Sequence, residues 1–278
     1  MVTRINSESA KASEPSDNDT TIGVESLKRH DEPTVLVMNS GKGGAGKTAL
    51  AHAIVHTVRS SGLKPVIFDF DAANPDLWAG WTEVDENDRF ALQTRSFDGW
   101  ESVMKMIQSL DASNVVVVDL PANAGELVEP FLGPMMEIGG YHATLWALDP
   151  GRKPMDALLK YAAVKTAEPI VVAKSIFKAD NGDRDFEAWG RFGAGVDLRG
   201  GFVFDVPPLD SAVRIAMVEG GEAAMTIEDL GTDRGGWSIS KIAEDKARPL
   251  HADRAKKWLA KLKPNVERAI AVARRVAP

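Results

Sequence analysis

The sequence predicts an α/β protein with a doubly wound, mostly parallel sheet and helices on both faces. Short apolar runs recur along the chain, as in strands that are buried on both faces. Stretches with helical periodicity separate several of these runs, which favours right-handed crossovers between parallel strands. Glycines or aspartates follow some of the runs, at the strand ends where open α/β sheets bind ligands. The runs are Thr34–Asn39, Pro65–Asp71, Asn114–Asp119, Thr144–Leu148, Pro169–Ala173 and Gly201–Val206.

Composition narrows the class of protein. The 278 residues are 44% hydrophobic and 26% charged, which is ordinary for a globular protein. Cysteine is absent, so disulfides, thiol chemistry and iron–sulfur ligation are excluded. No run of about 18 apolar residues predicts a membrane-spanning helix, and the N-terminus has no apolar signal segment. We therefore expect a cytoplasmic protein.

The uneven distribution of charge along the chain suggests that it consists of two parts, a tail and a domain. Residues 1–32 are polar, hold 4 Lys/Arg and 7 Asp/Glu, and are expected to form a disordered acidic tail. Residues 33–278 are expected to form a single domain with a basic C-terminal helical segment. Residues 241–278 hold 11 Lys/Arg and 4 Asp/Glu, which indicates either an anionic partner or a solvated helix face.

The stretch Ser40–Thr48 has the pattern of a phosphate-binding P-loop, G-x-x-x-x-G-K-[ST]. It follows a predicted strand and precedes an apolar helix that should extend to about Ser61. Glycines allow backbone N–H groups to turn toward phosphate oxygens. We expect Lys47 to reach the β- and γ-phosphates and Thr48 to bind Mg²⁺. The backbone of the cradle would come from Gly41, Gly43, Gly44, Ala45 and Gly46.

A second lysine, Lys42, lies near the start of the loop. The run Lys-Gly-Gly-x-Gly-Lys-Thr resembles the deviant Walker A motif of the ParA/MinD group of ATPases. That resemblance implies ATP and Mg²⁺ as cofactors and an ATP-bound homodimer. It also implies that Lys42 crosses the dimer interface and contacts the phosphates of the partner's nucleotide, so that Lys42 and Lys47 both act in catalysis.

Two aspartates end the second predicted strand, Pro65–Asp71. We expect Asp69 and Asp71 to serve different purposes. Val-Ile-Phe-Asp-Phe-Asp resembles the second acidic motif of the ParA/MinD group. The resemblance implies that Asp71 positions the attacking water and that Asp69 supports the magnesium side of the site or the structure. Residues 72–78 would form the switch I loop.

The buried run Asn114–Asp119 also ends in a carboxylate, as in a Walker B strand that holds Mg²⁺ through a water. Asp119 is therefore expected to be a metal ligand together with Thr48 and Asp69. The following Asp-Leu-Pro-Ala resembles the switch II motif of the group. Asn123 stands where relatives commonly carry glycine, which leaves open a protein that binds the nucleotide without hydrolysing it.

The segment after the last predicted strand resembles another motif of the group, in which a proline-containing loop lines the base pocket. The resemblance implies that Pro207 and Pro208 contact the base through backbone groups. Ala173 and Lys174 stand where the group often has an asparagine that reads the base. Adenine recognition by a side chain at that strand end is therefore not expected.

The remaining segments are less specific. Phe90–Thr94 reads as a short strand, and Trp100–Leu110 and Met155–Ala163 read as helices. Lys178–Gly200 looks like an insertion with aromatic residues, either for partner specificity or as a packing lid. Near the C-terminus, we expect two helices, Ala252–Leu262 and Val266–Val276, broken by Pro264.

The C-terminal lysines leave three alternatives: a docked terminal helix, a surface for nonspecific DNA, and a helix on a membrane surface. We expect an ATP-dependent dimerising ATPase switch, slow until a protein partner stimulates it, in plasmid or cargo partition through nonspecific DNA binding. One alternative is a conjugation or secretion accessory ATPase that acts through protein partners. Another is a small-molecule ATP-dependent enzyme on the same fold.

Overall fold

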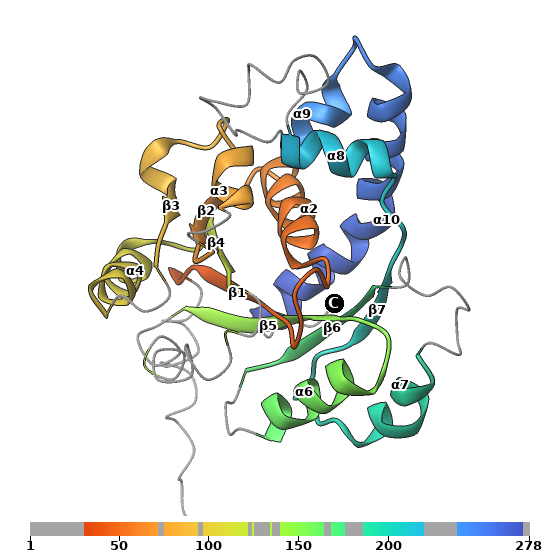
Figure 1. The fold of residues 1–278 in the computed structure, drawn as a ribbon. Coiled ribbons are helices and arrows are strands. Elements are labelled where there is room, and N and C mark those ends of the chain that lie inside the picture. Colours follow the sequence, from red (N-terminus) through yellow and green to blue (C-terminus); the bar gives the residue numbers. More distant parts are fainter. Residues whose placement is uncertain are drawn as a thin grey trace, which may run out of the picture. The chain divides into compact units, whose positions relative to one another are not determined.

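A seven-stranded parallel sheet lies at the centre of the computed structural model, in the order β3-β2-β4-β1-β5-β6-β7 (Figure 1). The structure describes residues 31–71, 75–93, 97–121, 124, 134, 140–163, 168–175, 186–219 and 238–274. The strands are β1 Thr34–Asn39, β2 Lys64–Asp69, β3 Arg89–Ala91, β4 Asn114–Asp119, β5 Tyr141–Leu148, β6 Ile170–Ser175 and β7 Val203–Val206. The predicted doubly wound α/β fold is confirmed.

Helices cover both faces of the sheet (Figure 1). One face packs against α2, α3, α8, α9 and α10, and the other against α4, α6 and α7. The helices are α2 Lys47–Ser60, α3 Asp76–Gly80, α4 Phe97–Ser109, α6 Arg152–Ala163, α7 Glu187–Phe192, α8 Ser211–Glu219, α9 Ile239–Glu244 and α10 Pro249–Ala273. Two short 3₁₀ turns, η2 and η5, span Glu86–Asp88 and Gly193–Gly195.

The central strand β1 explains why the core has two layers. All six of its residues are buried. Leu36 and Met38 face the α2 layer, whereas Val35 and Val37 face the α4 layer. Because β1 lies between β4 and β5, the chain that leaves it emerges in the middle of the carboxyl edge, where the winding of the sheet changes direction.

Strand β2 is shorter than the sequence predicts. It ends at Asp69, and Asp71 makes only an isolated bridge with Gln93. The amide of Leu92 still bonds the Asp69 carbonyl as in the ladder, but the amide of Asp71 turns to the Asp69 side chain. Regular pleating, which would place Asp69 and Asp71 on the same face, therefore does not extend to Asp71.

The prediction of two C-terminal helices is also wrong, because α10 is continuous. It is one helix with Pro264 inside it, where the sequence predicts two helices. Proline removes one backbone hydrogen bond and clashes with the preceding turn. The buried stripe nevertheless continues on both sides of Pro264, which is itself exposed, so packing holds the helix together. The stripe is Ala252, Ala255, Trp258, Leu259, Leu262, Val266, Ala269, Ile270 and Ala273.

Several predictions fall wholly or partly outside the described residues. These include the tail as far as residue 30, Asn123, and residues 178–185 of the expected insertion. Within the described residues, no helix has the length and apolar character needed to cross a membrane.

Candidate nucleotide-binding site

The P-loop connects β1 to α2, and two of its glycines are required by geometry. Gly46 is the N-cap of α2 and has a φ of 91°, in the left-handed region that favours glycine. A Cβ on Gly41 would lie 2.4 Å from the Cβ of Ala157 in α6. Only glycine therefore lets the start of the loop pass this close to the helix beside it.

The first turn of α2 is suited to an anion. Its N-cap Gly46 has no side chain that could accept the first N–H groups, and the first turn contains no acidic residue. Those N–H groups and the positive end of the helix dipole therefore face the loop. The arrangement is that of a phosphate site at a helix N-terminus.

Lys47 is buried beneath the loop. Its Nζ donates to the Oγ of Ser40 at 3.2 Å, and the Ser40 hydroxyl donates to the Lys42 carbonyl at 2.9 Å. Burial lowers the pKa of Lys47, while the carboxylates of Asp119 and Asp71 act in the opposite direction. These contacts hold the ammonium group close to the phosphate cradle.

Thr48 and Asp119 form the pair expected for magnesium. The Thr48 hydroxyl donates to Oδ2 of Asp119 at 2.9 Å. Oδ1 of Asp119 is buried and accepts no hydrogen bond from the described residues. Burial raises the pKa of Asp119 to about 7, helped by Asp69 and opposed by Lys47 and Thr48. A buried carboxylate with a spare oxygen beside a hydroxyl fits a hydrated Mg²⁺.

Asp69 lies next to Asp119 in the strand register but has different partners. Its Oδ1 accepts from the amide of Asp71 at 3.0 Å, and its Oδ2 accepts from the amides of Leu77 and Trp78 at 3.1 Å each. Burial raises the pKa of Asp69 to about 6, although these backbone donors oppose the shift. Both oxygens are thus engaged with the backbone.

Asp71 is half-buried just beyond β2. Its charge acts on Lys47, Asp119 and Asp76, which indicates that it faces the same region as the P-loop lysine. Burial raises the pKa of Asp76, and Asp71 adds to that shift. Residues 72–74, which belong to the expected switch I loop, are not described.

Lys42 lies at the rim of the loop with 64% of its side chain exposed. Its Nζ is 3.6 Å from Oδ2 of Asp149, which is almost completely buried after the end of β5. Lys42 therefore does not enter the cradle of its own subunit.

The loop after β7 holds Pro207, half-buried, and Pro208, exposed. The Pro207 carbonyl accepts from the Trp258 indole at 2.9 Å, which ties this loop to α10. Lys174 pairs with Asp205 at 2.8 Å and lies over the Phe186 ring. No contact that the structure gives for the described residues joins either proline to the P-loop.

Sequence reasoning missed three residues that shape the site: Ser40, Asp149 and Ser175. The Ser175 hydroxyl donates to the carbonyl of Ala45 in the P-loop at 2.6 Å, so β6 supports the loop from the side. Each of the three ends a parallel strand or directly follows one, at β1, β5 and β6. Their place at the carboxyl ends of the strands is the signal that could have identified them.

Helix α10 presents charge outward. Between residues 253 and 268, six basic and two acidic side chains are exposed. Lys257 pairs with Asp253, Lys263 with Glu267, and Arg254 with Asp210. The apolar stripe of α10 is buried in the core, so the helix is docked and does not offer that stripe to a membrane.

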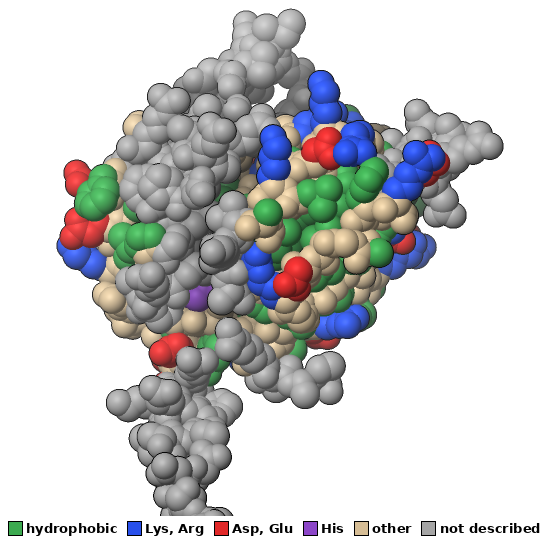
Figure 2. Space-filling view, turned by 90° about the horizontal axis from the view of Figure 1, so that it is seen from below, with side chains coloured by type: hydrophobic (Ala, Val, Ile, Leu, Met, Phe, Trp, Pro, Cys, Tyr) green, Lys and Arg blue, Asp and Glu red, His purple; other side chains and the backbone are tan. Residues whose placement is uncertain are grey.

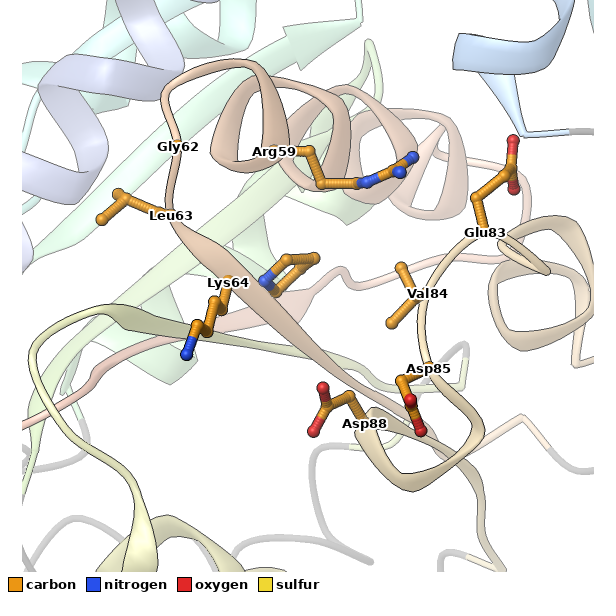
Figure 3. Close-up of a pocket in the computed structure, with 9 residues that line it drawn as sticks. Arg59, Gly62, Leu63, Lys64, Glu83, Val84, Asp85 and Asp88 are labelled. Carbon is orange, nitrogen blue, oxygen red and sulfur yellow. The ribbon is translucent and has the colours of Figure 1, made fainter.

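Two further surface features lie outside the cradle. Hydrophobic side chains bordered by Lys and Arg gather on the face where α6 and α7 lie (Figure 2). A separate pocket of about 340 Å³ has Arg59 of α2 and Lys64 of β2 on one side and Glu83, Asp85 and Asp88 on the other (Figure 3). It includes Lys64, the first residue of β2, whereas Asp69 ends that strand roughly 17 Å away. The pocket is therefore separate from the phosphate cradle.

Comparison with known proteins finds relatives of several kinds. The chain is 25% identical over 187 residues to Protein MobD of Acidithiobacillus ferrooxidans, a match that covers 65% of this chain and 80% of MobD. No family model matches. The match to the signal recognition particle receptor FtsY of Elizabethkingia anophelis covers 54% of each chain, at 23% identity and a TM-score of 0.38. The chain thus spans about half the length of that receptor.

Two other solved structures cover more of the chain. One is a putative plasmid partition protein of Borrelia burgdorferi B31 bound to AMPPNP, at 13% identity, covering 83% of this chain and 99% of that one, with a TM-score of 0.44. The other is the MinC:MinD cell division complex of Aquifex aeolicus, at 15% identity, 87% and 94% coverage, and a TM-score of 0.38. Plasmid partition proteins and MinD are thus among the solved structures that are similar to this chain.

Proposed function

We propose that this protein is an ATPase switch of the ParA/MinD type that dimerises around ATP. The observation that carries the proposal is that the two lysines of the P-loop lie in different environments. Lys47 is buried in the cradle of its own subunit, whereas Lys42 is exposed at the rim. A lysine that faces outward beside a phosphate site is suited to a nucleotide held by a second subunit.

The chain's own residues suggest how hydrolysis would proceed. The P-loop amides and Lys47 bind the phosphates, and Lys42 of the other subunit neutralises charge that develops in the transition state. Thr48 and Asp119 would hold Mg²⁺, which neutralises phosphate charge when bound. Asp71 accepts a hydrogen bond from the attacking water and orients it. Release of phosphate would then reopen the dimer.

Light scattering tests this proposal. We expect Asp71→Ala to be a dimer with Mg-ATP and a monomer with Mg-ADP. Adding Lys42→Ala should abolish the ATP dimer, whereas adding Lys105→Ala, a lysine exposed on α4, should leave it intact. A mass that does not respond to ATP would contradict the switch and favour a small-molecule enzyme on the same fold.

We further propose that the protein works in the cytoplasm, in plasmid or cargo partition. The ATP-bound dimer would bind DNA without sequence preference. The exposed basic face of α10 supports this, since lysines that neutralise phosphates give salt-dependent affinity. We also propose that a second protein binds this ATPase and stimulates its slow hydrolysis of ATP.

A second candidate is an accessory ATPase of conjugation or secretion that acts through a protein partner. The half-buried aromatic residues Trp189 and Phe192 on the α7 face favour it. DNA binding by the ATP dimer at low salt would favour the first candidate, and its absence the second.

A further inference from the structure

The segment from Phe70 to Trp78 leaves β2 and enters α3, and the carboxylate of Asp69 binds both of its ends. One oxygen accepts the amide of Asp71 at the start of the segment. The other accepts the amides of Leu77 and Trp78 at its end. A single buried side chain therefore ties the backbone of Asp71 to the first turn of α3.

Helix α3 explains why such an acceptor is needed. The first N–H groups of a helix have no partner within the helix. The N-cap residue of α3 is Pro75, which makes no side-chain cap. Leu77 is fully buried, so water cannot replace the missing acceptor. Asp69 supplies it from eight and nine residues earlier in the chain.

A carboxylate suits this position better than an amide. Three N–H groups converge on it, and both of its oxygens are acceptors. An asparagine has one acceptor oxygen and no charge, so it would bond these N–H groups more weakly and would leave at least one of them facing its NH₂ group. The same isosteric change at Asp119, the neighbour in register, would not disturb these three bonds.

The two adjacent carboxylates therefore have different tasks. Asp119 bonds the Thr48 hydroxyl and keeps one oxygen without a hydrogen bond from the described residues. Both oxygens of Asp69 accept hydrogen bonds from backbone N–H groups. We infer that Asp69 is a positioning residue that caps α3 at a distance and holds Asp71 next to the start of α3, and is not a magnesium ligand. Its effect on hydrolysis rests on the function proposed for Asp71.

Hydrogen exchange of the nucleotide-free protein tests the structural part without reference to activity. Asp69→Asn should speed exchange at the amides of Leu77 and Trp78 by about 10-fold or more, because hydrogen bonds to a charged acceptor are lost. The control Asp98→Asn, at an exposed position in α4, should change these rates by less than about twofold. Unchanged protection in Asp69→Asn overturns the inference, whether or not the protein hydrolyses ATP.

A rescue variant separates capping from metal binding. Pro75→Asp gives α3 a cap of its own, so Asp69→Asn/Pro75→Asp should recover much of the lost protection. If Asp69→Asn does not fold, recovery of the fold in the double variant supports the inference, and failure of both overturns it.

The kinetic arm uses steady-state hydrolysis. Asp69→Asn should lower kcat by about 10-fold or more, with the half-saturating Mg²⁺ concentration changed by less than about twofold. Pro75→Asp should restore part of kcat. A large rise in that concentration with kcat unchanged would make Asp69 a metal ligand and overturn the inference. If the wild-type protein has no ATPase activity, the proposed function fails while the exchange experiment still decides the role of Asp69.

Discussion

Replacing Asp119 by asparagine should stabilise the nucleotide-free protein at alkaline pH while removing its magnesium site. Burial and the nearby Asp69 raise the pKa of Asp119 to about 7, from an ordinary value of 3.8. The folded state therefore holds a proton that the unfolded chain has already lost between these two pH values. For a carboxyl group with a raised pKa, the stability is present at low pH and declines as the pH rises toward 7.

The size of the effect follows from the shift. Each pKa unit corresponds to about 1.4 kcal/mol, and pH 5 to pH 7 spans two units of the declining range. Between pH 5 and pH 8, the free energy of unfolding of the wild-type protein should therefore fall by about 3 kcal/mol more than that of Asp119→Asn. Asp69, whose pKa is about 6, contributes a smaller decline to both proteins.

Urea unfolding at pH 5, 6, 7 and 8, in EDTA and without nucleotide, measures this difference. Asp98→Asn, at an exposed position in α4, controls for the loss of one surface charge. Mg-ATP should then stabilise the wild-type protein at pH 8 far more than it stabilises Asp119→Asn. Parallel pH profiles for the wild type and Asp119→Asn would refute the reasoning.

Three further changes probe the packing and the basic face. Gly41→Ala should lower the stability by about 1–3 kcal/mol and weaken ATP binding, because its Cβ would meet Ala157; urea unfolding and nucleotide titration measure both. Pro264→Ala, at an exposed site in α10, should raise the thermal midpoint by restoring a helix hydrogen bond, and an unchanged or lower midpoint would count against this. Lys256→Gln with Lys261→Gln should lower DNA affinity and flatten its salt dependence in fluorescence anisotropy, whereas equal slopes would remove α10 from the DNA surface.

Sequence reasoning succeeded where local signals decide the structure. The P-loop and the strands before Ser40 and after Ser113 were predicted with their correct bounds, because continuous apolar runs mark strands buried on both faces. It failed at Asp71, because the end of β2 depends on where the Asp69 side chain finds its donors. These donors lie two, eight and nine residues later, in a turn and a short helix, and leave no periodic signal.

Tertiary packing explains the remaining differences. Proline inside a helix costs about 3 kcal/mol, yet each large apolar side chain buried by α10 contributes roughly 1.5–3 kcal/mol. Several such side chains on both sides of Pro264 outweigh the break. The pairing of Lys42 with Asp149 joins residues more than 100 positions apart, which spacing alone cannot predict.

The C-terminal end of α10 is bonded to the first strand of the sheet. Arg274 donates to the Thr34 hydroxyl at 2.6 Å and to the Ala112 carbonyl at 2.8 Å, beside the starts of β1 and β4. Helix α10 also packs against α2, the helix that follows the P-loop. During synthesis, the ribosome must therefore release residue 274 before the outer layer over the phosphate-binding helix is complete.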